Sequence, residues 1–306
     1  MPAMRSRHYS VEKIGEGIHA AIARPSGYSI CNSGLVDLDG GSLVFDTGLT
    51  PDSAQDLKTV ASKALGHAPS LAAISHWHLD HSVGCQEFSS VPIWGTTRTR
   101  EILLENRDRL LAELTPEELR KAIKELEALR AAARSDAARD DADLFLRINR
   151  ALLAAAGKVK LTPPDHTFDH RLPLPGKRGA DLISFGKGHT DADALLFLPH
   201  EKVVFTGDLV CVGVQPSMGS GDPDHWLIVL DEIERLAPER VVPGHGPVTN
   251  VEGIEETRAY VSGVIDAAEA RPGETLPPAI RRWEGSMSLE ENLKYVRARR
   301  AARDQG

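Results

Sequence analysis

The sequence predicts an α/β protein, in which short strands alternate with helices. Residues 28–48 predict a β-hairpin, because strand-like residues flank an Asp-Gly-Gly turn at 39–41. A helix is expected next, with Thr50 as its N-cap and Gly66 just past its end. The apolar run from Leu71 to Ser75 then predicts another strand. This order of strand, helix and strand is typical of layered α/β folds.

The second half of the chain continues the alternation. Residues 194–205 predict another hairpin, and residues 223–237 predict an amphipathic helix. The last helix is expected to start at the capping box Ser288-Leu289-Glu290-Glu291. Its end, at 297–303, is basic, which is typical of a solvated helix terminus. We therefore interpret residues 270–306 as a C-terminal helical extension.

Residues 97–157 differ from the rest in composition. They are rich in Ala, Leu, Glu and Arg and contain almost no glycine. A capping box begins at Thr115, and a second helical stretch is expected from about Asp141 to Ala156. We interpret the segment as a helical hairpin inserted into a single domain that spans residues 1–306. Its role stays open: it is a lid that shapes the substrate mouth, or else an ordinary surface helix pair or a homodimer contact.

The net charge, the hydropathy and the cysteine content limit which binding partners and which cellular location are expected. The net charge of −8 disfavours nucleic acid, because phosphate binding needs a basic face. No apolar run approaches the roughly 18 residues that a membrane span needs, and no apolar segment follows the basic start. Cys31, Cys85 and Cys211 are odd in number and far apart, which is typical of buried thiols in a reducing compartment. We therefore expect a cytoplasmic protein with no membrane partner.

The most informative stretch is His76-Trp77-His78-Leu79-Asp80-His81, which follows an apolar run. Because alternate residues of an extended chain point the same way, His76 and His78 can bind one metal while Asp80 and His81 turn toward a second. Imidazole and carboxylate suit zinc, and also iron and manganese. A run of surface histidines is the alternative, but three further candidate ligands argue against it.

These three candidates share one local setting. Each follows a short strand-like run and lies beside glycine, as expected for the first loop residue beyond a buried strand. They are His189 in Gly-His-Thr, Asp208 in Thr-Gly-Asp and His245 in Pro-Gly-His-Gly. Asp46, in Phe-Asp-Thr-Gly, ends the earlier hairpin in the same way. His166 and His170 are expected to lie outside the metal site.

With five motifs in this order, the sequence resembles the metallo-β-lactamase fold superfamily from about Ile14 to Val248. The resemblance implies an αββα sandwich, with two mixed β-sheets flanked by helices. It also implies two ligand sets and a carboxylate that bridges them: His76, His78 and His189; Asp80, His81 and His245; and Asp208 between the two. Two Zn2+ ions are implied, with Fe or Mn as alternatives. Asp46 is expected to accept a hydrogen bond from a ligand imidazole or a backbone group.

The implied chemistry is the hydrolysis of a small-molecule substrate. Water held between two such cations loses its proton near neutral pH, and Asp80 is expected to orient the resulting hydroxide. The bond cleaved would be an ester, thioester, lactone or β-lactam-type amide. One major class of true metallo-β-lactamases has Cys where Asp208 stands, and another has Ser there. The bridging Asp therefore looks more like that of glyoxalase II or a lactonase.

Three other functions stay open at this point. One is a β-lactamase proper, since the same hydroxide can attack a strained amide. Another is a mononuclear iron oxygenase of the persulfide dioxygenase type, which would use His76, His189 and Asp208 and leave the second set empty. The last is a non-catalytic binding module that kept the fold, although none of the expected ligands is missing.

Overall fold

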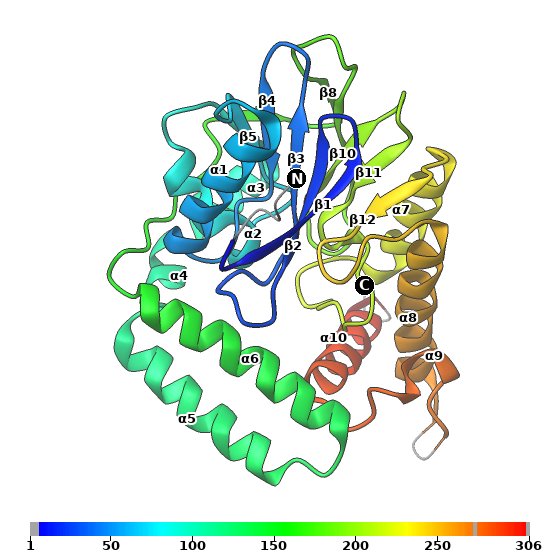
Figure 1. The fold of residues 1–306 in the computed structure, drawn as a ribbon. Coiled ribbons are helices and arrows are strands. Elements are labelled where there is room, and N and C mark those ends of the chain that lie inside the picture. Colours follow the sequence, from blue (N-terminus) through cyan, green and yellow to red (C-terminus); the bar gives the residue numbers. More distant parts are fainter. Residues whose placement is uncertain (1–5, 272–273, 304–306) are drawn as a thin grey trace.

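The computed structural model describes residues 6–271 and 274–303, and it confirms the predicted fold class. Two mixed β-sheets pack face to face, and helices cover both outer sides (Figure 1). The core between the sheets contains Leu43 and Phe45 from one sheet and Leu196 and Phe205 from the other, all buried. Burial of these apolar side chains favours the two-layer arrangement, because each sheet hides one face against the other.

The first sheet has its strands in chain order. The first four are antiparallel neighbours, whereas the fourth to the seventh run parallel. The strands are β1 (Tyr9–Gly15), β2 (Ile18–Ala23), β3 (Ser33–Asp37), β4 (Ser42–Phe45), β5 (Leu71–Ala73), β6 (Ile93–Thr96) and β7 (His166–Phe168). The predicted first hairpin is therefore confirmed as the pair β3 and β4.

The second sheet has the order β12-β11-β10-β9-β8 and is antiparallel except between β11 and β12. Its strands are β8 (Arg171–Pro173), β9 (Asp181–Gly186), β10 (Asp193–Leu198), β11 (Val203–Phe205) and β12 (Arg240–Val242). The strands β10 and β11 confirm the second predicted hairpin.

Helices on the two outer faces bury apolar stripes against the sheets. On the first sheet, α1 (Pro51–Leu65) packs Leu57 and Val60 into a buried cluster with strand residues. On the second sheet, α7 (Pro223–Arg235) and α8 (Val251–Glu269) do the same, with Trp226 fully buried. The predicted limits of α1 are confirmed, because Thr50 caps it and Gly66 adopts the left-handed conformation, with φ of 82°.

The segment between β6 and β7 is helical, as predicted. It contains α3 (Thr97–Glu105), α4 (Arg107–Glu113), α5 (Pro116–Ala132) and α6 (Asp136–Ala155). The last two form a hairpin that lies across one end of the sandwich (Figure 1). The predicted start of the second helix at Asp141 was wrong, because Ser135 caps α6 earlier by accepting a hydrogen bond from the Ala138 N–H.

The C-terminal part contains α9 (Pro278–Arg281) and α10 (Met287–Arg303). The predicted cap at Ser288 was wrong. Ser286 Oγ accepts the Leu289 N–H at 3.2 Å, whereas Ser288 is bound to Asp141 of α6. The basic end of α10 is also not merely solvated, because its arginines form ion pairs at the start of α7. These pairs are Arg299 with Asp222 at 2.7 Å and Arg300 with Asp224 at 2.8 Å.

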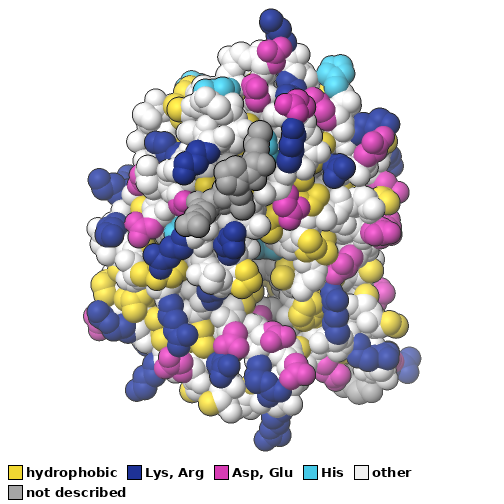
Figure 2. Space-filling view, in the orientation of Figure 1, with side chains coloured by type: hydrophobic (Ala, Val, Ile, Leu, Met, Phe, Trp, Pro, Cys, Tyr) yellow, Lys and Arg dark blue, Asp and Glu magenta, His cyan; other side chains and the backbone are white. Residues whose placement is uncertain are grey.

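Three shorter helical segments complete the description: α2 (Leu79–Ser82), and the 3-10 turns η1 (Val83–Phe88) and η2 (Gly207–Leu209). The three cysteines are buried and free. Within residues 6–271 and 274–303, every helix is too short or too polar to cross a membrane. On the face shown in Figure 2, basic and acidic side chains are interspersed, and hydrophobic side chains border a hollow near its middle.

The contact between Asp141 and Ser288 predicts a measurable stability effect. The buried Asp141 carboxylate accepts the Ser288 N–H at 2.8 Å and its hydroxyl at 2.6 Å, which joins the inserted helices to α10. Asp141→Ala should lower the free energy of unfolding in urea by about 2–3 kcal/mol, the usual cost of losing hydrogen bonds to a charged group. Asp143→Ala is the matched control: its exposed ion pair with Arg130 should contribute less than about 1 kcal/mol. Equal losses in both variants would contradict this role.

Candidate metal centre

The chemistry-bearing side chains all follow strand ends. His76 and His78 lie in the loop after β5, and Asp80 and His81 form the first turn of α2. Three more come from the second sheet: His189 after β9, Asp208 in η2 after β11, and His245 after β12. The strand ends of both sheets therefore meet at one edge of the sandwich.

At this edge the seven residues form two groups, and within each group the candidate ligand atoms lie within 4.8 Å of one another. One group is His76, His78, His189 and Asp208, and the other is Asp80, His81 and His245. His166 and His170 are exposed and belong to neither group, as predicted. The arrangement agrees with the two ligand sets that the sequence implies.

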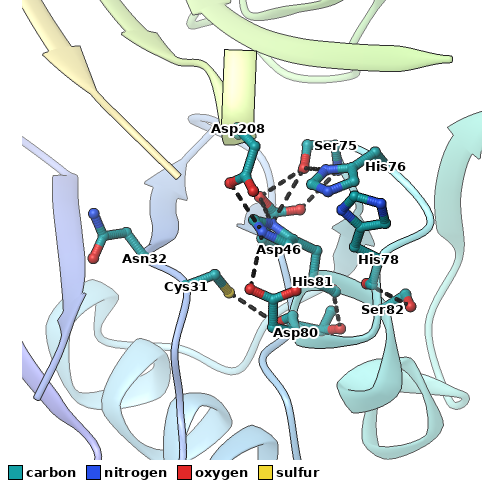
Figure 3. Close-up of polar contacts among 12 residues, drawn as sticks. Cys31, Asn32, Asp46, Ser75, His76, His78, Asp80, His81, Ser82 and Asp208 are labelled. Atoms are coloured by element: carbon teal, nitrogen blue, oxygen red, sulfur yellow. Dashed lines mark hydrogen bonds and ion pairs between the residues drawn. The ribbon is translucent and has the colours of Figure 1, made fainter. Parts of the chain in front are cut away.

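Asp208 lies between the two groups and contacts members of both. Its Oδ2 atom lies 3.4 Å from His189 Nε2 in the first group and 3.2 Å from His245 Nε2 in the second. Its Oδ1 atom lies 3.1 Å from His81 Nε2. In Figure 3 the His81 ring is seen between the carboxylates of Asp208 and Asp80. A carboxylate in this position would help to hold a cation bound at either group.

Hydrogen bonds on the outer side of the rings fix their orientation. Asp46 Oδ2 accepts His81 Nδ1 at 2.9 Å and also the Ser75 hydroxyl at 2.9 Å. Because the Ser75 hydroxyl is thus a donor to Asp46, it accepts a hydrogen bond from His76 Nδ1, at 2.9 Å. His76 then carries its proton on Nδ1, and its Nε2 keeps a free lone pair that faces the site. Burial opposes a charge on His81, but the acidic groups around it outweigh burial and raise the pKa of His81, so its Nε2 carries a proton that a metal would displace.

The rings of His245 and His78 are oriented in the same manner, whereas His189 Nδ1 has no hydrogen-bond partner among the described residues. His245 Nδ1 lies 3.2 Å from the Ile30 carbonyl oxygen, and His78 Nε2 lies 2.8 Å from Ser220 Oγ. The remaining nitrogen of each ring points to the site, where His78 Nδ1 is 3.0 Å from His189 Nε2. Two imidazole nitrogens that face each other this closely are placed to bind the same metal ion.

The donor atoms fit a metal ion by two criteria. His76 Nε2 is buried and has no hydrogen-bond partner among the described residues, which is costly for a polar atom unless a ligand satisfies it. Two ligands bound tetrahedrally about 2.0–2.2 Å from zinc lie roughly 3.3–3.6 Å apart. The 3.0–3.5 Å separations between the facing atoms here are close to that value.

Burial and charge set the protonation of the rings. Burial lowers the pKa of His76 and His189 and brings the pKa of His78 to about 3, so these rings are neutral, the form that binds metals. Burial also opposes a charge on His245, but Asp208 and Asp80 outweigh it and raise the His245 pKa to about 10. A metal that binds the second group must therefore displace a proton from His245.

Sequence reasoning missed several residues that hold the ligands in place. Asn32 Nδ2 donates to the carbonyl oxygens of Pro243 and Gly246, at 2.9 and 2.8 Å, and so fixes the loop that carries His245. Asp193 accepts the Thr190 N–H at 2.9 Å, and burial raises the pKa of its carboxyl to about 7. The partners of Asn32 lie more than two hundred residues away in the chain, so no local motif marks this residue.

The glycines that precede Asp208 and His245 in the sequence do have a structural reason. A Cβ at Gly244 would lie 2.0 Å from Asp208 Oδ1, and one at Gly207 would lie 2.4 Å from the Ser75 Cβ. Gly207 also has a positive φ of 52°. Gly207 is required where the two sheets approach each other, and Gly244 is required where the loops after β11 and β12 of one sheet meet at Asp208.

A cavity of about 490 Å³ opens over the two groups. His78, Asp80, His189, Asp208 and His245 are among the residues that line it. Much of the remaining lining is apolar and comes from the β2 region, from α6 and from residues 214–217. The inserted helix α6 thus forms part of the cavity wall.

The role of Asp46 can be tested by metal binding. Asp46→Asn removes the charge that orients His81 and Ser75, so zinc affinity should fall about 10- to 100-fold, as for other residues that orient metal ligands. Competition with a chromogenic chelator measures the affinity. Asp39→Asn is the matched control, because Asp39 also has a left-handed φ, 53° against 64° for Asp46, but is exposed in a turn. Unchanged affinity in Asp46→Asn would rule out the orienting role.

Comparisons with known proteins agree with this geometry. A family model described as the metallo-beta-lactamase superfamily matches residues 27–245. A curated relative, the "Metallo-beta-lactamase type 2" of Bacteroides fragilis, is 29% identical over 126 residues, which cover 39% of this chain and 50% of the relative. The chain thus spans about half the length of that curated relative.

Solved structures with the same fold cover more of the chain. The DIM-1 metallo-beta-lactamase aligns with a TM-score of 0.58 and 18% identity over 83% of this chain and 97% of its own. The mono-zinc form of FIM-1 from Pseudomonas aeruginosa gives 0.59 and 17%, with 83% and 95% covered. VMB-1 gives 0.61 and 17%, with 87% and 100% covered. Such identities show the fold alone, but the family model covers most of the chain, and this chain belongs to the metallo-beta-lactamase superfamily.

Proposed function

We propose that this protein is a hydrolase that binds two divalent cations, zinc foremost, and cleaves an ester, thioester, lactone or β-lactam-type amide. One observation carries the proposal: Asp208 contacts imidazoles of both ligand groups, at 3.1–3.4 Å. When bound, a pair of such cations supplies an acidified water and a polarised carbonyl oxygen. Membership of a superfamily of mostly metal-dependent hydrolases supports the same reaction class.

Asp80 is the residue that we assign to orienting the attacking water. Its Oδ2 atom lies 3.3 Å from His245 Nε2 and 3.5 Å from His81 Nε2, at the cavity wall. The Cys31 thiol donates to the Asp80 backbone carbonyl at 2.9 Å, which holds the residue in place. The carboxylate therefore faces both the second ligand group and the substrate space.

The alternative functions differ in what they require of the second ligand group. A mononuclear iron oxygenase would need only His76, His189 and Asp208. Yet Asp80, His81 and His245 are already assembled, with His81 oriented by Asp46. A non-catalytic module has no use for either group. We therefore favour the dinuclear hydrolase, with β-lactams as one substrate class among several.

The proposed partner is a small molecule, because the two groups open into a cavity of about 490 Å³. We also propose a cytoplasmic location, since free, buried cysteines are typical of a reducing compartment. A nucleic-acid substrate is disfavoured by the net charge of −8.

Metal content and turnover test the proposed function directly. The purified protein should contain about two zinc ions per chain. It should hydrolyse at least one member of a panel of lactones, thioesters, aryl esters and β-lactams, and lose that activity with a chelator. His76→Ala should reduce kcat/KM by at least about a hundredfold, because it removes a ligand rather than a residue that orients one. His170→Ala is the matched control, since His170 is exposed and outside both groups.

The outcomes separate the candidates. One iron per chain, together with oxygen consumption, would replace the hydrolase by the oxygenase. Full turnover by His76→Ala would contradict any role of the first ligand group in catalysis.

A further inference from the structure

The part of the cavity wall that α6 forms contains a positively charged side chain, Arg147. The α6 side chains Leu144, Ile148 and Leu152 line the cavity and present an apolar surface to it. Arg147 lies on the same helix face and lines the cavity with them. An arginine among apolar side chains is costly to desolvate, so its position calls for an explanation.

Among the residues that the structure describes, the guanidinium of Arg147 lacks a counter-ion. Its Nη1 donates to the Pro25 carbonyl oxygen at 3.2 Å, and its Nε is buried with no partner. Within the described ranges, no carboxylate lies within 4.0 Å of it in an ion pair. Burial also lowers the pKa of Arg147, a sign that the group is partly desolvated.

Other arginines of α6 are paired, which sets Arg147 apart. Arg150 forms an ion pair with Glu127 at 2.8 Å, and Arg139 forms one with Asp136 at 2.5 Å. Both lie on the exposed side of the hairpin. A charge that serves only solubility or helix pairing would resemble these two, whereas Arg147 faces a cavity.

Arg147 also lines a second, more open pocket with Asp140 and Asp143, but no ion pair joins it to a carboxylate of the described residues. Asp143, one helical turn before it, is paired with Arg130 of α5. Glu12 lines the same cavity, but it is exposed and forms no ion pair with Arg147. The acidic groups at the floor, Asp80 and Asp208, are engaged with histidines. The positive charge is therefore available to a molecule inside the cavity.

We propose that Arg147 binds an anionic group of the substrate, a carboxylate in the first place. This inference rests on the proposed hydrolase function and names its substrate class: a small acyl compound with an apolar body and an anionic group distant from the bond that is cleaved. The planar guanidinium matches a carboxylate through two parallel hydrogen bonds. The apolar side chains of α6 would contact the body of the same molecule.

A matched pair of substrates tests the charge preference. One is a para-nitrophenyl ester whose acyl chain ends in a carboxylate, and the other ends in the neutral carboxamide. With the zinc-loaded protein, kcat/KM should be higher for the carboxylate. Arg147→Met should reduce the ratio of the two kcat/KM values roughly 10- to 100-fold, the usual effect of a hydrogen bond to a charged group, and mainly through KM. Arg147→Lys should restore part of the ratio, since it returns the charge without the planar fork.

Arg150→Met is the control variant, because it removes the same kind of side chain from the same helix. It should leave the substrate ratio unchanged. Retained turnover of the carboxamide by Arg147→Met would show that the variant is folded. If both substrates are hydrolysed and Arg147→Met leaves their ratio unchanged, the anion site is wrong while the hydrolase stands.

Binding provides a test that does not depend on turnover. Calorimetric titration of the zinc-loaded protein with hexanoate and with hexanamide should show tighter binding of hexanoate, and Arg147→Met should abolish the difference. Failure of the whole substrate panel would contradict the proposed function but leave this measurement decisive for Arg147. Equal affinity of hexanoate for the native protein and for Arg147→Met, with Arg150→Met as control, would overturn the inference.

Discussion

The site depends on a buried carboxylate, Asp208, held among imidazoles at the meeting point of the two sheets. Asp208 is buried, and its oxygens lie 3.1–3.4 Å from three histidine nitrogens. Charges are rarely buried unless they are paired or bind metals, so the surrounding chain must supply compensation. The histidines supply this compensation. The strand ends position them, Gly207 and Gly244 leave room for the close approach, and the hydrogen bonds on the outer side of the rings orient them.

The orientation of the rings is transmitted through a short hydrogen-bonded chain. Asp46, held with a left-handed φ of 64°, receives hydrogen bonds from the Ser75 N–H and hydroxyl and from His81. Its contact with the Ser75 N–H also explains why β5 ends at Ala73 rather than at the predicted Ser75: that N–H is used by a side chain and not by a neighbouring strand. Local strain at Asp46 is thus offset by three hydrogen bonds.

The sequence predicted the fold class and the residues that come together, because both leave local signals. A strand-like run followed by Gly-Asp marks Asp208, and one followed by Pro-Gly-His marks His245. Both signals are local and do not depend on the sequence between the two residues. Contacts between distant segments leave no such signal. Asn32 binds a loop more than two hundred residues away, at Pro243, and Ser286 rather than Ser288 caps α10 because Asp141 of the inserted helices holds Ser288. Which of two serines caps a helix is decided by packing that no short window contains.

Different parts of the chain form the two halves of the cavity. The candidate metal ligands lie on one half, and the inserted helix α6 forms part of the other. The floor comes from strand ends that both sheets fix, so side chains there have little freedom. The opposite wall comes from α6, which is joined to the sandwich through Leu152 and its neighbours and to α10 through Asp141. The hydrogen bonds that orient the floor residues involve no α6 side chain. If Arg147 binds an anionic group as proposed, a substrate preference at this wall could vary without disturbing the candidate metal ligands, because function resides in sites that a shared fold carries.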